Sequence, residues 1–254
     1  MTEWVISLGG TKDVQLIIDG KRTDGRTLDE LRAIRIEAGV IPEADGSSYI
    51  EWGNNKIVCG VYGPRECIPR HGASPYGATL KCRYMMSPFS SLEEHSRSGP
   101  SRRSNELSKV IREALENVLL LGKFPNTQIE IYIDVLQADG GTRTASLTAA
   151  AVALANAGIP MKDMVAAVAV GKASETLVVD LNKPEDNLGQ SDMPIAMSHR
   201  DKNLLLVQMD GLLTKEEISK MLDMVEKSCD EIHEVQADAL RRIYKTEQKE
   251  PFRW

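Results

Sequence analysis

The stretch that decides the fold is residues 128–160, QIEIYIDVLQADGGTRTASLTAAAVALANAGIP. Residues 128–136 alternate apolar and polar side chains, which is the period of a half-buried strand. Residues 142–157 then form an alanine-rich segment that stops at Gly158-Ile159-Pro160, as a helix does. Asp139-Gly140-Gly141 is left as the turn between them. A strand that passes through a glycine turn into a helix predicts a fold that mixes α and β elements.

Further strands and helices are expected on both sides of this stretch. Before it, we expect strands at 34–40, 48–52, 56–62 and 80–86, a loop at 87–103, and a helix at 105–121 that begins after Ser104 and ends at Gly122. After it, we expect strands at 165–171, 176–181, 194–198 and 203–210, and a last helix at 215–244 capped by Thr214. Each half of the chain is thus a set of strands followed by a long helix.

This order predicts an α+β fold made of two fused halves. We expect an N-terminal arm over residues 1–20 and one domain over 21–248, with sub-regions at about 21–158 and 159–248. No apolar run reaches the ~18 residues that would cross a bilayer, and the first residues lack the pattern of a secretory signal. Four cysteines without a CxxC pair are expected to be reduced thiols. A cytoplasmic protein without a membrane anchor is therefore expected.

The charge of the chain is unevenly distributed. The whole sequence carries a net charge of −6, which argues against a nucleic-acid-binding protein. Residues 64–103, however, hold seven Lys/Arg against three Glu, a local charge of +4. Such a basic segment can bind phosphates while the rest of the molecule stays acidic.

The glycine turn is a candidate anion site. Gly140 and Gly141 let the backbone approach a ligand closely, and the free N–H groups of a helix start attract anions. Thr142 adds a hydroxyl group and Arg143 adds a fork of charged donors, so Gly141, Thr142 and Arg143 would suit inorganic phosphate. A tight turn with a threonine cap explains the same residues equally well.

Three aspartates follow in the second half. Asp180 ends an expected strand, Asp186 lies in an expected turn, and Asp192 precedes the next strand. Paired carboxylates such as Asp186 and Asp192 could bind a divalent metal, Mg²⁺ or Mn²⁺, or one of them could protonate a leaving oxygen. Aspartate is also common in turns without any catalytic role.

Arginine pairs complete the set of candidates. Arg102 and Arg103 follow Pro100-Ser101, and Arg70-His71 lies upstream. Guanidinium forks bind two oxygens of a phosphodiester, so these four residues are candidates for binding an RNA backbone. A solvated loop is the alternative.

Taken together, these segments resemble the RNase PH family over roughly residues 20–245. The similarity runs through Arg22-Thr23-Asp24-Gly25-Arg26, Glu30-Leu31-Arg32, Ala44-Asp45-Gly46-Ser47, Val61-Tyr62-Gly63-Pro64, residues 137–143, Asp180-Leu181-Asn182 and Ser191-Asp192-Met193-Pro194, in the order of the family. Within the family, Pro100-Ser101-Arg102-Arg103 and the helix after it are most similar to the catalytic RNase PH-like subunits of archaeal exosomes.

The resemblance implies a fold and an activity. The fold would have mixed sheets packed with helices, as in domain 2 of ribosomal protein S5, and would form rings. The activity would be 3′-to-5′ degradation of single-stranded RNA by phosphorolysis, with inorganic phosphate as co-substrate and nucleoside 5′-diphosphates as products. In reverse, the reaction would add 3′ tails.

The resemblance also implies partners and residue roles. Three such chains would alternate with three copies of a paralogous, inactive subunit, under S1/KH-type RNA-binding caps. Asp186, Asp192 and Arg143 would be catalytic. A non-catalytic ring scaffold and a stand-alone RNase PH that trims transfer RNA are the alternatives. The carboxylate pair disfavours the scaffold, and the Pro-Ser-Arg-Arg block disfavours the stand-alone enzyme.

Overall fold

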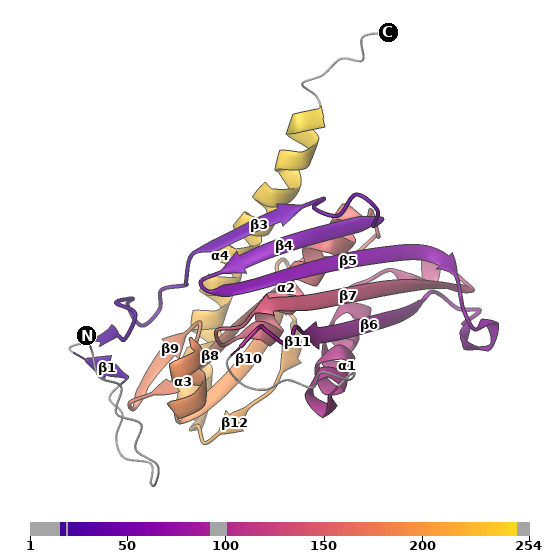
Figure 1. Cartoon of the computed structure of the whole chain (residues 1–254). Helices are drawn as coiled ribbons and strands as arrows, with labels where there is room; N and C mark the ends of the chain where they lie inside the picture. Colours follow the sequence, from indigo (N-terminus) through magenta and orange to yellow (C-terminus); the bar gives the residue numbers. More distant parts are fainter. Residues whose placement is uncertain (1–15, 19, 92–100, 248–254) are drawn as a thin grey trace.

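Two five-stranded sheets form the frame of the chain, of which a computed structural model describes residues 16–18, 20–91 and 101–247 (Figure 1). The first sheet has the order β3-β4-β5-β7-β6, with bounds Ile34–Ala38, Gly46–Trp52, Asn55–Glu66, Thr127–Gln137 and Thr79–Met86. Its neighbouring strands are antiparallel except for β6 and β7, which run parallel. Because β6 and β7 are parallel, Met86 and Gln137 end at the same edge of the sheet, where the candidate site lies.

The second sheet is antiparallel throughout and has the order β11-β10-β8-β9, with β12 pairing to β10. Its strands are Leu204–Val207, Ser191–Ser198, Val165–Ala173, Thr176–Val179 and Asp210–Gly211. A two-residue ladder of β1 (Ile17–Ile18) and β2 (Lys21–Arg22) lies beside it. In this sheet Asp192 is paired with Asp210, so two acidic residues face each other across β10 and β12.

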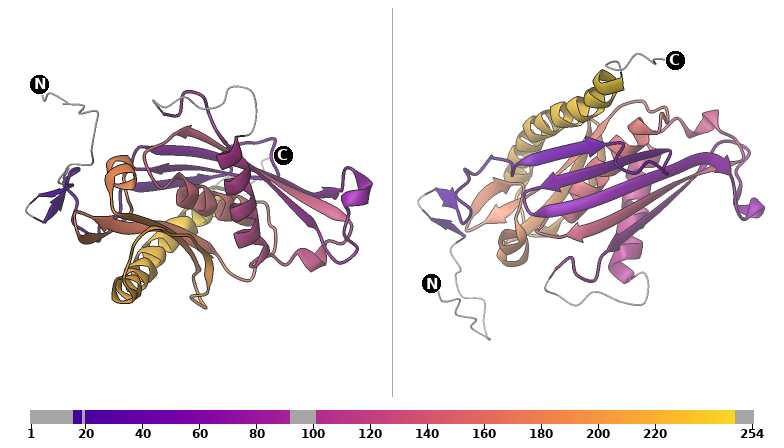
Figure 2. Two further views of the ribbon diagram at one scale, coloured as in Figure 1. Left: turned by 90° about the horizontal axis from the view of Figure 1, so that it is seen from below. Right: turned by 45° about the horizontal axis from the view of Figure 1, so that its top comes forward.

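Helix α2 (Thr142–Asn156) lies between the two sheets and contacts β4, β5 and β8 (Figure 2). Nearly all of its residues are buried, which explains why it is apolar all round rather than amphipathic. Helix α1 (Arg102–Glu116) packs against β6, and α4 (Lys215–Glu247) packs along β8 and β3. None of the helices in the described ranges is both long and apolar enough to cross a membrane.

Small residues allow β4 to lie directly on α2. A Cβ atom at Gly46 would come within 2.3 Å of the Ala157 nitrogen and 2.4 Å of the Ala153 carbonyl oxygen. Two residues along, the hydroxyl of Ser48 donates a hydrogen bond of 2.7 Å to the carbonyl of Ala149. The alanine-rich sequence of α2 is therefore explained by the close approach of a strand.

The sequence prediction of α1 was wrong at both ends, because it placed the helix at 105–121. The helix begins at Arg102 and its N-cap is Ser101, whose hydroxyl accepts a hydrogen bond from the Ser104 nitrogen. A start after Ser104 was expected because serine is a preferred N-cap residue, and Ser101 meets the same preference. The helix ends at Glu116, and Gly122 lies in a short 3₁₀ helix instead of capping α1. Residues 92–100 of the expected loop lie outside the described residues.

Three smaller elements also differ from expectation. The turn that holds Asp186 is a short helix, α3 (Lys183–Leu188), which begins with a capping box between Asn182 and Glu185. Strand β9 ends at Val179 because Asp180 adopts a left-handed backbone conformation, with φ of +57°. The expected strand at 203–210 is divided into β11 and β12, which pair with different parts of β10.

A buried carboxylate lies where β9 turns into α3. Asp180 is 2% exposed and accepts hydrogen bonds from the backbone nitrogen of Arg32 at 2.7 Å and from the indole of Trp52 at 2.9 Å. The Arg32 guanidinium binds both of its oxygens, at 2.6 and 3.0 Å. Although burial opposes ionisation, these donors hold the pKa of Asp180 below its usual value. Asp180 is therefore a charged structural centre.

We predict that Asp180→Asn destabilises the chain by about 3–5 kcal/mol, the range for breaking a buried ion pair. The amide keeps the shape of the side chain but leaves the buried guanidinium of Arg32 without its counter-charge. Urea unfolding followed by circular dichroism measures the change. The control is Glu37→Gln, which breaks an exposed ion pair with Arg35 and should have little effect. Equal urea midpoints for Asp180→Asn and wild type would contradict the prediction.

Candidate active site

The candidate site lies at the junction of β7 and α2. Gly140 and Gly141 both have left-handed backbones, with φ of 66° and 65°. A Cβ at Gly140 would lie 2.6 Å from the carbonyl carbon of Asn182, so the turn packs directly against the chain that leads into α3. This contact brings the start of α2 next to Asp186, although the two are more than 40 positions apart in the sequence.

The start of α2 carries no side-chain cap. Its N-cap is Gly141, and the hydroxyl of Thr142 instead accepts a hydrogen bond of 3.1 Å from the buried Tyr84 hydroxyl. The interpretation of Thr142 as an ordinary helix cap is therefore wrong. A helix start without a side-chain cap leaves its first N–H groups free for a bound anion.

Asp186, which lines the cleft, lies beside Asp192. Asp186 lies in the first turn of α3 and Asp192 is the second residue of β10, and their side chains are within hydrogen-bonding reach. Burial, the charge of Asp186 and the nearby Asp210 raise the pKa of Asp192 to about 7. Burial also raises the pKa of Asp186, although Arg103 and Arg143 oppose that shift. The two carboxyl groups therefore share a proton near neutral pH, as close carboxylate pairs do.

Two arginines stand opposite these carboxylates. Arg143, in the first turn of α2, lowers the pKa of both aspartates through its charge, and its buried Nε atom has no hydrogen-bond partner within the described part of the chain. Arg103, in the first turn of α1, acts on Asp186 and on Tyr84 in the same way. One cleft is lined by Arg103, Gly140, Gly141, Thr142, Lys183 and Asp186.

The sequence prediction missed Lys183 and Asp210. Lys183 lines the cleft because it begins α3, the helix that was expected to be a turn. Asp210 contributes negative charge to Asp192 through the pairing of β12 with β10. No local pattern marks either residue, since both depend on strand and helix pairings that are set by the whole fold.

The predicted RNA-binding residues are not all brought together. Both Arg102 and Arg103 are exposed, but only Arg103 is among the described residues that line the cleft. Arg70 and His71 are exposed in a 3₁₀ helix before β6, and Arg70 pairs with Glu66 at 2.8 Å. Because β6 has its last residue at the cleft and its first beside this helix, roughly 25 Å separates the two places. Within one chain, Arg70 and His71 therefore lie far from Asp186.

The carboxylate pair is suited to a small divalent cation. Asp192 Oδ1 is buried without a hydrogen-bond partner among the described residues, and burial raises the pKa of both carboxyl groups, with the charge of Asp186 adding to the rise at Asp192. Hard divalent cations prefer such oxygen ligands. The described residues contain no cluster of three or more His, Cys, Asp or Glu side chains arranged around a metal, so further ligands would have to come from substrate or water.

Comparison with known proteins assigns the chain to a family. Residues 30–160 match domain 1 of the 3′ exoribonuclease family, RNase PH, and residues 163–228 match its domain 2. The chain belongs to the RNase PH family. Exosome complex component Rrp41 of Thermococcus kodakarensis is 50% identical over 93% of this chain and 95% of its own length. Rrp41 of Archaeoglobus fulgidus is 50% identical over 92% and 91%.

Three further matches extend this result. Rrp41 of Methanosarcina mazei is 51% identical over 90% of this chain, which spans 46% of that longer protein. A chain in the structure of the Archaeoglobus fulgidus exosome with RNA bound to the active site has a TM-score of 0.75 and 25% identity over 85% of this chain and 92% of that one. Rice Rrp46, with a TM-score of 0.76 and 22% identity over 87% and 100%, shares the fold. The expected α+β RNase PH fold and 3′ exoribonuclease family are confirmed.

The raised pKa of Asp192 predicts a pH-dependent effect of Asp192→Asn on the stability of the chain. The unfolded carboxyl ionises near 3.8 and the folded one near 7, so wild type loses stability as the pH rises through this interval. The amide cannot ionise, so the variant should be more stable than wild type at pH 8, with a difference that shrinks toward pH 4. Thermal unfolding across this range measures it.

Asp230→Asn is the control of opposite sign. Its hydrogen bond with Lys202 lowers the pKa of Asp230, so this carboxylate stabilises the fold at neutral pH and the variant should be less stable than wild type there. A stability difference for Asp192→Asn that stays constant with pH would contradict the assignment of the raised pKa.

Proposed function

We propose that this chain is the catalytic subunit of an exosome ring and shortens RNA from its 3′ end by phosphorolysis. The observation that supports this most strongly is the juxtaposition of an uncapped helix start with a carboxylate pair of raised pKa in one cleft. The first part suits an attacking phosphate, and the second suits a departing oxygen. A hydrolase would need no site for a phosphate co-substrate.

Inorganic phosphate would be bound by Gly141, Thr142 and Arg143. The backbone at Gly141 approaches the ligand without a side chain in the way, and Thr142 keeps its hydroxyl proton for donation because it accepts from Tyr84. Arg143 Nε is buried without a partner among the described atoms, and a phosphate oxygen would satisfy it. Its charge would also offset repulsion between the incoming phosphate and the RNA.

The reaction would be a displacement at the last phosphodiester of the RNA. A phosphate oxygen attacks the phosphorus atom, the bond from phosphorus to the 3′ oxygen breaks, and the proton goes to that 3′ oxygen. Asp192, with a pKa that burial and the charge of Asp186 raise to about 7, can hold this proton at neutral pH. The products are a nucleoside 5′-diphosphate and RNA shorter by one residue. Since one phosphate linkage replaces another, the reverse reaction adds 3′ tails when diphosphates are abundant.

As the alternative to this proton transfer, Asp186 and Asp192 would hold a divalent cation, Mg²⁺ or Mn²⁺, as ionised carboxylates. Such an ion would neutralise negative charge that develops between phosphate, RNA and the carboxylates. The buried Asp192 Oδ1 atom, which has no hydrogen-bond partner among the described residues, supports this alternative, because a cation would offset the cost of burying two adjacent carboxylates.

RNA would enter as a single strand along the basic residues. Arg103 lies in the cleft and would hold the phosphates nearest the cleaved bond, with Arg102 next to it on the first turn of α1. Arg70 and His71 would bind the strand further from its 3′ end, or the strand in a neighbouring subunit, because they lie at the opposite end of β6. Backbone contacts of this kind are independent of RNA sequence.

The proposed ring contains three copies of this chain and three of a paralogous inactive subunit, with S1/KH-type caps. The two Archaeoglobus fulgidus matches support a second chain of this fold: Rrp41 is 50% identical to this chain, but the chain matched in that exosome structure is only 25% identical. The presence of both Asp186 and Asp192 favours the catalytic role over the scaffold.

We expect RNA degradation to require inorganic phosphate and to release nucleoside 5′-diphosphates, because the anion site at α2 supplies the attacking group. Chromatography of the products from labelled RNA, with the chain assembled with its ring partner, measures this. Release of nucleoside monophosphates at a similar rate without phosphate would show that the enzyme is a hydrolase.

Asp186→Asn should slow turnover by about 10²-fold or more and leave RNA affinity nearly unchanged, since the group acts in the chemical step.

Arg103→Glu should weaken RNA binding more than Arg102→Glu, because only Arg103 lines the cleft. The loss should be similar for all RNA sequences, and the dependence of affinity on salt should become flatter since fewer counterions are released. Filter binding at several salt concentrations measures both effects. Size-exclusion chromatography is the control for ring assembly. Equal losses for the two variants, or rings that fall apart, would contradict the assignment of Arg103.

A further inference from the structure

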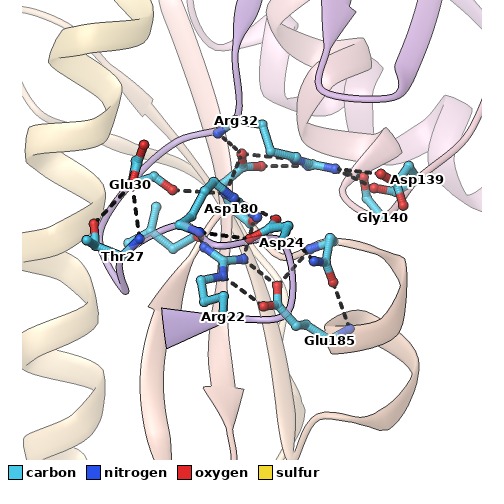
Figure 3. A network of polar contacts seen from close by, with 12 residues as sticks. Arg22, Asp24, Thr27, Glu30, Arg32, Asp139, Gly140, Asp180 and Glu185 are labelled. Atoms are coloured by element: carbon cyan, nitrogen blue, oxygen red, sulfur yellow. Dashed lines mark hydrogen bonds and ion pairs between the residues drawn. The ribbon is translucent and has the colours of Figure 1, made fainter. Parts of the chain in front are cut away.

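Three arginines near the N-terminus form a buried network of ion pairs with Asp180 and Glu185 (Figure 3); they are Arg22, Arg26 and Arg32. Arg22 binds the carboxylate of Glu185, with its Nε atom at 2.7 Å, and its Nη2 atom donates to the carbonyl of Asp180 at 2.8 Å. Arg26 donates to the same carbonyl at 3.2 Å and pairs with the Asp180 carboxylate at 3.3 Å. Both arginines therefore fasten the segment between β9 and α3.

Arg32 differs from the other two because its guanidinium reaches the glycine turn. It binds the Asp180 carboxylate with Nε and Nη2, at 3.0 and 2.6 Å. On its other side, Nη1 donates to the carbonyl of Asp139, and Nη2 lies 3.4 Å from the carbonyl of Gly140. The side chain is 8% exposed and so joins the structural carboxylate to the turn that opens α2.

This turn needs external support because it contains two consecutive glycines. Glycine has the widest conformational freedom, and both residues adopt a left-handed backbone. Only Arg32 and Asn55 donate hydrogen bonds to the carbonyl of Gly140 among the described residues, the amide of Asn55 at 2.7 Å. These two side chains therefore hold the turn in one conformation.

Fixing the carbonyl groups of Asp139 and Gly140 also fixes the N–H groups of Gly140 and Gly141, because each carbonyl shares a rigid peptide plane with the next N–H group. In a planar trans peptide the N–H group points away from the carbonyl of the preceding residue. Holding the carbonyls of Asp139 and Gly140 toward Arg32 therefore turns the N–H groups of Gly140 and Gly141 away from it. Gly140 and Gly141 both line the cleft that also contains Thr142 and Asp186.

We infer that Arg32 is a positioning residue for inorganic phosphate, because it holds the Asp139–Gly140 carbonyl groups against Asp180 and so orients the donors at the start of α2. Arg32 does not touch the phosphate. The inference rests on the proposed phosphorolytic function and adds to it the residue that preorganises the anion site.

The test compares Arg32→Lys with Arg26→Lys in the chain assembled with its ring partner. Lysine keeps a charge beside Asp180 but has no fork to bridge the carboxylate and the carbonyl groups. For Arg32→Lys we expect the KM for phosphate to rise about tenfold or more, with RNA affinity and kcat at saturating phosphate within about twofold of wild type. Arg26→Lys also changes a partner of Asp180, but the hydrogen bonds that Arg26 makes within the described residues go to Asp24, Glu30 and Asp180 and not to the turn, so its KM for phosphate should stay near that of wild type.

A chemical rescue separates positioning from general stability. Arg32→Ala should regain a lower KM for phosphate when millimolar guanidinium is added, because Arg32 borders an open pocket that a small cation can enter. If Arg32→Ala does not fold, the lysine variant still carries the test. An unchanged KM for phosphate in Arg32→Lys, or an equal loss of RNA affinity, would overturn the inference. Wild-type activity that does not depend on phosphate would instead overturn the proposed function.

Discussion

The ion pair between Asp180 and Arg32 is the constraint on which the rest of the site depends. Asp180 ends β9, turns the chain into α3 and accepts hydrogen bonds from Arg32 and Trp52. Because it is fully buried, its charge is tolerated only with these donors in place. The same residue thereby sets the positions of Asp186, which follows it on α3, and of the glycine turn, which Arg32 reaches. The carboxylate pair proposed to act in catalysis is thus supported by a third carboxylate, Asp180, that is held entirely within the structural ion pairs.

Opposite charges are concentrated at the cleft. Arg103, Arg143 and Lys183 come from the starts of three helices; Arg103, Lys183 and Asp186 line the cleft, and the charge of Arg143 acts on both Asp186 and Asp192. This arrangement explains how a chain with a net charge of −6 has a site suited to two anionic substrates. The positive charge is local, and it opposes but does not cancel the rise that burial causes in the pKa values of Asp186 and Asp192.

Much of the fold could be predicted from short-range patterns, because a strand or helix with one buried face repeats with a fixed period. The strand at 128–136, the helix at 142–157 and the Thr214 cap all depend on such patterns, and the structure has them within a few residues. The start of α1 could not be predicted, since Ser101 and Ser104 are both acceptable caps and only the packing of the helix decides between them. The same limit applies to the site. Asp186 and Asp192 were found as aspartates near strand ends, but the support from Arg32 joins residues about 150 positions apart, which no local pattern records.

These long separations have a consequence for the newly made chain. Arg22 and Glu185 are 163 positions apart, and Arg32 and Asp180 are 148 apart. Contacts between residues so far apart in the sequence close a large loop, and they therefore form late in folding. During synthesis the N-terminal arginines leave the ribosome long before the carboxylates that bind them, and the glycine turn is made before the helix it packs against. A nascent chain that stops short of β9 has no assembled cleft, so an unfinished molecule cannot cut the RNA that surrounds it during translation.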